Sequence, residues 1–189
     1  MNTKVNDTDL LFIYKKAEPS ERFGIIYYNY ADFPKMIRKI EKKLQYKINA
    51  EREYLKSKNK GELGIRVKIS NLSDITADTA INNVSLEECI KKGVLDSKIL
   101  KGIEQAPVYE DYIHTLRMMR MDYDLMAEII EDLPYKDCEL IKEYLIEGKH
   151  IRDISKEYKK SYDCIKKRLT NIREDIKEEI LECFDMSWG

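Results

Sequence analysis

Apolar side chains recur at alternating spacings of four and three residues over three heptads, from Tyr112 to Leu133. An α-helix places residues at these spacings on one face, whereas a strand changes face at every residue. Pro107 suits the first turn of such a helix, and Pro134 stops it. We expect one long helix over residues 107–132, and its seam favours packing within the chain over a homodimer. The seam consists of Tyr112, Leu116, Met119, Tyr123, Met126, Ile130 and Leu133.

A second amphipathic helix is expected over residues 33–58, with Asp32 as its N-cap and Pro34 in its first turn. Its apolar residues again follow spacings of three and four, and its basic residues lie on the other face. The chain of 189 residues has only 7 glycines and 4 prolines, which favours an all-α fold with few tight turns. The apolar stripe consists of Phe33, Ile37, Ile40, Leu44 and Ile48.

Two domains are expected, a helical N-terminal region over residues 1–105 and a C-terminal domain over residues 106–189. The first 30 residues look irregular, and the run from Ile25 to Tyr30 fits either a short strand or the start of a helix. Further on, short helices joined by loops are predicted by caps at Ser73-Asp74, at Asp96, and at Ser85 in a capping box with Glu88. Gly93 and Gly102 would end two of them.

The net charge of −1 is the sum of blocks of opposite sign. Lys35 to Lys60 holds ten basic residues against three acidic ones, and Lys149 to Arg173 holds nine against three. The intervening helix from Glu110 to Asp132 is acidic, seven to two, and could present a surface to a protein partner. Such blocks suit polyanion-binding faces or plainly solvated ones. For the basic helix 33–58, phosphate contact, an acidic partner and simple solubility stay open, with solubility favoured.

No apolar run approaches the ~18 residues that span a bilayer, so no membrane partner is expected. The run from Leu10 to Tyr14 is too short for a signal-peptide core, and a cytoplasmic protein is expected. The four cysteines are widely spaced, without a CxxC pair, and predict free thiols. They are Cys89, Cys138, Cys164 and Cys183.

Nothing in the sequence predicts an enzyme, a cofactor or a metal site. His114 and His150 are the only histidines, and neither has a partner at metal-ligand spacing. The chain has no HExxH motif, no phosphate-cradling glycine loop and no nucleophile elbow. Asp122 and Asp124 have the spacing of a metal pair, but residues i and i+2 of a helix point apart. We interpret them as part of a solvated face.

The C-terminal region predicts three consecutive helices over residues 135–181. The first runs from Tyr135 to Glu147 and ends at Gly148, the second from His150 to Tyr158. Ser161 then caps the third, with Asp163 in its first turn. The third helix has a buried stripe of Ile165, Leu169, Ile172 and Ile176. This order of elements is typical of a helix-turn-helix.

If that stripe faces the core, the first turns of the third helix must present polar side chains outward. A helix-turn-helix offers this part of its second helix to base edges in the major groove of double-stranded DNA. Lysine can donate to guanine, and aspartate can accept from cytosine. The predicted base-reading residues are Tyr162, Asp163, Lys166 and Lys167; the predicted phosphate contacts are Lys149, Arg152, Lys156, Lys159, Lys160, Arg168 and Arg173.

The stretch from Leu133 through Gly148, Ile151 to Tyr158 and Ser161 to Arg173 resembles region 4 of sigma-70-family factors, closest to the extracytoplasmic-function type. The resemblance covers about 45 residues and implies contact with promoter DNA and with RNA polymerase. In that family the base-reading positions would fall on the four residues just named. No region 2 signature is found in residues 1–130, so a complete sigma factor is not expected.

A broader resemblance covers nearly the whole chain. Its elements are, in order, an aromatic start (Tyr27 to Tyr30), a basic helix, a polar segment around Ser73 to Ala80, a further helix and a sigma-4-like end. The order of these elements resembles that of phage regulators of the RinA and ArpU type. That resemblance implies an activator of late genes in a phage or prophage. The alternative is a phage assembly protein such as a small terminase subunit, which also combines a helix-turn-helix with helical oligomerisation segments.

Overall fold

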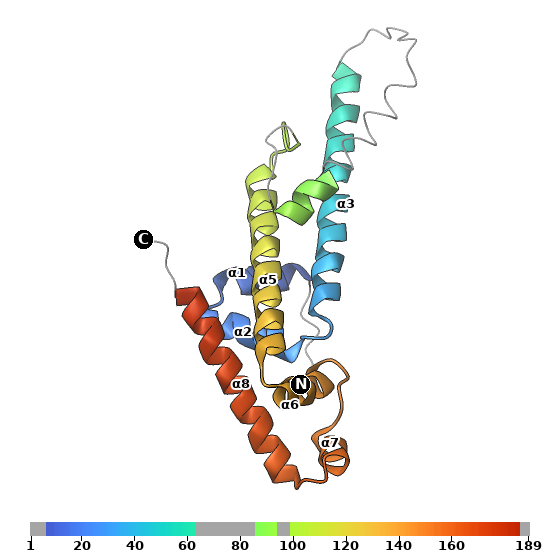
Figure 1. Ribbon diagram of the computed structural model, residues 1–189. Coiled ribbons are helices and arrows are strands. Elements are labelled where there is room, and N and C mark those ends of the chain that lie inside the picture. The colour runs from blue at the N-terminus through green and yellow to red at the C-terminus, as the bar shows by residue number, and fades with distance from the viewer. Residues whose placement is uncertain (1–6, 63–85, 94–98, 186–189) are drawn as a thin grey trace. The chain divides into compact units, whose positions relative to one another are not determined.

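The computed structural model describes residues 7–62, 86–93 and 99–185 (Figure 1). Its described residues form helices, turns and irregular connections and contain no strand, so the all-α prediction is confirmed. The predicted caps at Ser73-Asp74, Ser85 and Asp96 lie outside the described residues. Residues 86–92 are helical, and the other helices are α1 (Asp7–Lys16), α2 (Pro19–Tyr28), α3 (Phe33–Glu62), α5 (Ala106–Asp132), α6 (Tyr135–Leu145), α7 (Ile151–Glu157) and α8 (Tyr162–Asp185).

The chain divides into two compact units, and each unit combines segments that are far apart in sequence. Unit 1 comprises residues 1–11 and 37–118, and unit 2 comprises residues 12–36 and 119–189. This division differs from the expected boundary at residue 106, because α2 packs against α8. Helices α3 and α5 each contribute to both units.

Unit 1 contains the basic helix, which continues to Glu62, beyond the expected end near residue 58. The predicted apolar stripe of α3 from Ile37 to Ile48 is buried, together with Ile113 and Leu116 of α5. The hydroxyl of Tyr109 donates to the Glu51 carboxylate at 2.8 Å and links these two helices. Burial and this hydrogen bond raise the pKa of Tyr109 to about 12. In this unit one residue of the predicted seam of α5, Leu116, is buried, whereas the other, Tyr112, is half-buried.

The expectation of an irregular start is wrong for the described residues, because they form α1 and α2. The run that fitted a strand or a helix start belongs mostly to α2, whose Phe23, Ile26 and Tyr27 are buried. Glu18 and Glu21 form a capping box at the start of α2, and Pro19 occupies the first turn, where its missing N–H costs no helical hydrogen bond. Since α2 packs on α8, these side chains belong to the core of unit 2.

The interpretation of Asp122 as part of a solvated face is wrong, because its side chain is only 6% exposed. Its carboxylate accepts a hydrogen bond from the Tyr14 hydroxyl at 2.7 Å and lies 3.5 Å from the guanidinium of Arg22. Burial raises the pKa of Asp122, although the hydrogen bond and the guanidinium oppose the shift. Asp124, two residues on, is exposed as expected. Asp122 therefore joins α5 to α1 and α2 inside unit 2.

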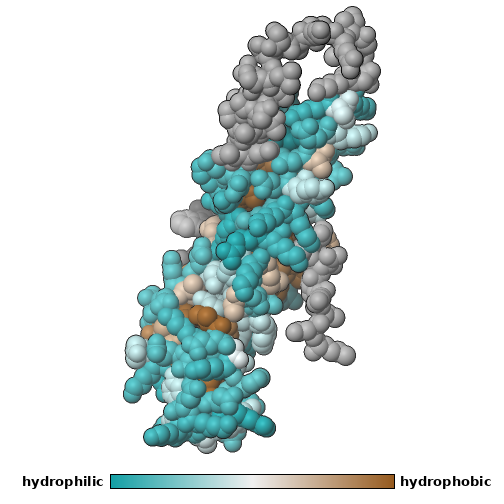
Figure 2. Space-filling view, turned by 90° about the vertical axis from the view of Figure 1, so that its right-hand side faces the viewer, coloured by the Kyte–Doolittle hydropathy of each residue, from teal (hydrophilic) through white to brown (hydrophobic). Residues whose placement is uncertain are grey.

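Hydrophilic residues make up most of the surface on the face drawn in Figure 2, and apolar residues appear there as smaller patches. Among the helices that the structure describes, none has the length and apolar character needed to cross a membrane.

Candidate nucleic-acid interface

Helices α6, α7 and α8 follow one another in unit 2 and pack together in all three pairs (Figure 1). Gly148 separates the first two, and its φ of 67° suits a residue without a Cβ atom. His150 has extended backbone at the N-cap of α7. The Ser161 hydroxyl accepts a hydrogen bond from the N–H of Cys164 at 3.2 Å, as an N-cap side chain does. The local signals read from the sequence thus coincide with the helix ends.

The turn between α7 and α8 has the geometry of a Schellman motif. The N–H of Lys160 donates to the carbonyl of Ser155 at 3.0 Å, and the N–H of Lys159 donates to that of Lys156 at 3.2 Å. Lys159 stands at the position that glycine usually occupies, and its φ is 49°. A side chain in this left-handed region costs roughly 1–2 kcal/mol, so the turn is held at some expense to stability.

All four residues of the apolar stripe of α8 that was predicted to face the core are buried. Ile165, Leu169, Ile172 and Ile176 are between 0% and 4% exposed. At 100° per residue the opposite side of the first turns carries the residues expected to read bases. Tyr162, Asp163, Lys166 and Lys167 are all exposed, and Tyr162 retains 43% of its accessible surface.

The predicted phosphate contacts fall into two groups according to their partners. Five lysine and arginine side chains around α7 and the start of α8 are exposed, and within the described part of the chain they form no ion pair. They are three of the predicted phosphate contacts, Arg152, Lys159 and Lys160, and two of the base-reading candidates, Lys166 and Lys167. Lys156 is 78% exposed and forms only an i,i+3 pair with Asp153 at 3.3 Å.

Lys149 has a different environment, which its sequence position did not reveal. Its ammonium lies 2.9 Å from Glu157, 3.4 Å from Glu143 and 3.4 Å from Glu147. The hydrogen bond to Glu157 is the main reason that the pKa of Lys149 is raised. Three carboxylates around one ammonium leave the cluster negative, and a phosphate would be repelled there. Lys149 therefore holds α6 to α7, beside the hydrogen bond from the Tyr158 hydroxyl to Glu143 at 3.3 Å.

Arg173 also has partners within the fold. Its guanidinium lies 5.4–5.8 Å from the ring centres of three aromatic residues of α2, Phe23, Tyr27 and Tyr28. It also forms an ion pair with Glu174 at 2.7 Å. A cation over several rings stabilises packing between elements, so Arg173 fastens α8 to α2.

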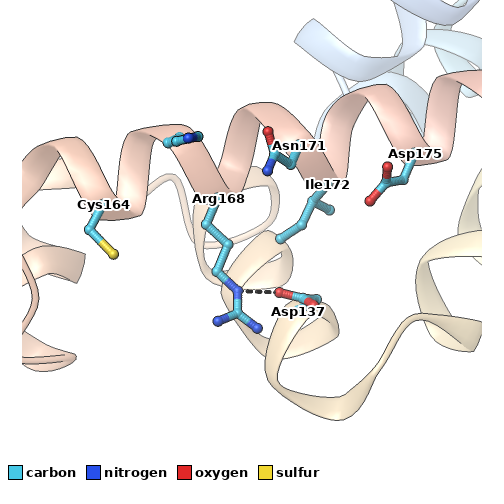
Figure 3. A pocket seen from close by; sticks show the side chains of 7 residues that line it. Asp137, Cys164, Arg168, Asn171, Ile172 and Asp175 are labelled. Atoms are coloured by element: carbon cyan, nitrogen blue, oxygen red, sulfur yellow. Dashed lines mark hydrogen bonds and ion pairs between the residues drawn. The ribbon is translucent and has the colours of Figure 1, made fainter.

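Arg168 points from α8 toward α6, where its Nε donates to the Asp137 carboxylate (Figure 3). The ion pair crosses an open hollow of about 380 Å³ on the flank of α8. The hollow is lined by Asp137, Cys164, Lys167, Arg168, Asn171, Ile172 and Asp175. Asp137 and Asn171 did not figure in the sequence interpretation, since nothing local shows that residue 137 meets residue 168.

The described residues contain no group of three side chains able to hold a metal ion. All four cysteines are free thiols, and Cys138 is buried whereas Cys164 is exposed. Comparison of the chain with protein-family models, curated proteins and solved structures finds no match.

Proposed function

We propose that the chain binds double-stranded DNA with sequence preference and regulates transcription, reading the major groove with the first turns of α8. The supporting observation is the arrangement of this helix. Its apolar stripe is buried to 4% or less, while Tyr162, Asp163, Lys166 and Lys167 are exposed beyond it, next to a basic turn. Lysine and aspartate there have the chemistry to discriminate base edges.

Phosphate contacts are assigned to the exposed basic residues without ion pairs among the described residues. Arg152, Lys159 and Lys160 flank the start of α8, as the positioning contacts of a helix-turn-helix do. Lys149, Arg168 and Arg173 are assigned to holding α6, α7, α8 and α2 together, because each meets partners within the fold.

The resemblance to sigma region 4 and to RinA and ArpU regulators extends the proposal to activation of phage or prophage late genes, with RNA polymerase as partner. A small terminase subunit is the alternative, since it also binds DNA through helices. Stoichiometry separates the two: a ring of many subunits favours packaging, and a monomer or dimer favours transcription.

The direct test is selection of bound sequences from a random duplex library, using the full chain and a Lys166→Glu/Lys167→Glu variant. The wild type should yield a consensus, and the variant should lose it, because each bidentate base contact contributes ~1–3 kcal/mol of discrimination. A Lys58→Glu/Lys101→Glu variant changes the net charge equally at exposed positions of unit 1 and should retain the consensus. If no consensus emerges, or if both variants keep it, the reading role of α8 is refuted.

A second prediction separates stability from affinity at one residue. Lys159→Gly should raise the free energy of unfolding by about 0.5–1 kcal/mol. Glycine adopts the left-handed backbone without steric strain, and this gain exceeds the extra conformational entropy that glycine loses on folding. The same change should weaken DNA binding by removing a phosphate contact. Urea denaturation and fluorescence anisotropy measure the two effects.

Lys160→Gln is the matched control, since Lys160 is an exposed neighbour without a positive φ. It should weaken binding with no gain in stability. If the Lys159→Gly protein binds DNA as tightly as the wild type, Lys159 does not contact the DNA.

A further inference from the structure

The outward half of α3 is rich in cations. Five basic residues between positions 38 and 47 are exposed, and Tyr46 lies among them with 75% of its surface accessible. Only one acidic residue, Glu41, falls in this interval, and it lies toward the flank of the helix. We call this set the basic stripe: Arg38, Lys39, Lys42, Lys43, Tyr46 and Lys47.

The stripe lies opposite the apolar face of the same helix. Ile37, Ile40, Leu44 and Ile48 are at most 4% exposed, so the core of unit 1 fixes which side of α3 faces solvent. At 1.5 Å per residue the stripe extends over about 14 Å. A DNA strand advances 3.4 Å per phosphate along the helix axis, so about four phosphates lie within that length.

Among polyanions, duplex DNA matches this face better than a membrane or a single strand does. An amphipathic helix that binds a membrane inserts its apolar face, and the apolar face of α3 is already covered. Proteins that bind single strands stack successive bases on aromatic rings, whereas the stripe has one tyrosine among its cations. A duplex backbone needs only cations and hydrogen-bond donors, which lysine, arginine and the tyrosine hydroxyl supply.

We propose that the basic stripe of α3 binds the phosphate backbone of duplex DNA without regard to sequence. The inference builds on the proposed function, because duplex DNA is then the ligand of both surfaces. The start of α8 selects the sequence, and the stripe adds affinity and salt dependence. The two basic blocks of the sequence would then serve the two surfaces: Lys35 to Lys60 contains the basic stripe, and Lys149 to Arg173 contains the start of α8.

The test measures binding of the full chain to a random-sequence duplex and to the selected duplex between 50 and 200 mM salt, a range in which phosphate contacts dominate the change in affinity. The stripe variant carries Arg38→Gln, Lys42→Gln and Lys47→Gln. It should flatten the slope of log K against log salt by about 2 to 3 on both duplexes, roughly 0.9 for each phosphate that the variant no longer neutralises. Its preference for the selected sequence should be unchanged.

A control with Lys91→Gln, Lys92→Gln and Lys101→Gln removes the same charge from exposed positions elsewhere in unit 1 and should keep the wild-type slope. Equal slopes for the stripe variant and the control overturn the inference. A stripe variant that loses affinity for a single-stranded oligonucleotide but not for duplex overturns the choice of ligand.

The two proposals fail in distinguishable ways. If the Lys166→Glu/Lys167→Glu variant keeps its consensus while the stripe variant loses salt dependence, the reading role of α8 fails and the stripe stands. If the first variant loses its consensus while the stripe variant behaves as wild type, the reverse holds.

Discussion

Replacing Asp122 with alanine is expected to lower the free energy of unfolding by about 3–5 kcal/mol, because the change removes the acceptor of the buried Tyr14 hydroxyl and a carboxylate beside the half-buried guanidinium of Arg22. The Tyr14 hydroxyl would lose its 2.7 Å hydrogen bond, and Arg22 would lose a carboxylate 3.5 Å away. An unsatisfied buried hydroxyl alone costs about 1–3 kcal/mol. Urea denaturation followed by circular dichroism measures the loss.

The chain provides a control two residues away. Asp124 is exposed on the same helix, and Asp124→Ala should change the free energy of unfolding by no more than about 0.5 kcal/mol. Both substitutions remove one carboxylate from the acidic helix, so net charge and helix propensity are matched. Similar losses for the two variants would show that Asp122 does not tie α5 to α1 and α2.

Replacing Ile154 with alanine is expected to cost about 2–5 kcal/mol and to abolish selective DNA binding. The structure describes every residue of α7, and among them only Ile154 is buried, with 0% exposure. A cavity at this position removes the one buried side chain with which α7 packs between α6 and α8. The candidate base-reading and phosphate-contact side chains all remain in the variant, so any loss of sequence preference comes from their misplacement.

Ile154→Val removes a single methylene group and supplies the graded comparison. It should cost about 0.5–1.5 kcal/mol and leave the selected consensus intact. Binding is measured at a temperature where both variants remain folded by circular dichroism. An Ile154→Ala protein that keeps its full sequence preference would show that α8 reads DNA without α7.

Local sequence signals were sufficient for the helices around the candidate site. The stripe from Ile165 to Ile176 depends only on the pitch of one helix, and burial follows its period. The cap at Ser161 is likewise local, because the Ser161 hydroxyl accepts a hydrogen bond from the N–H of Cys164, three residues later. Such features are written within a few residues of one another, and they located the start of α8.

The roles of several charged residues depended on distant parts of the chain. Asp122 meets Tyr14, which is 108 positions earlier, and Arg168 meets Asp137, which is 31 positions earlier. Arg173 contacts rings in α2, a helix that the sequence did not predict because its apolar run is too short to show a period. Sequence spacing therefore identified the cations of the candidate site but could not separate the exposed cations from those that hold helices together.

The composition of unit 2 from residues 12–36 and 119–189 has a consequence for the timing of its formation. The ribosome makes the aromatic side chains of α2 long before it makes α8, their packing partner. At ~5–20 residues per second, the segment between them takes roughly 7–27 seconds to synthesise. During that interval Phe23 and Tyr27 have no native neighbour on α8, and the packing of α2 on α8 can form only after the chain is nearly finished.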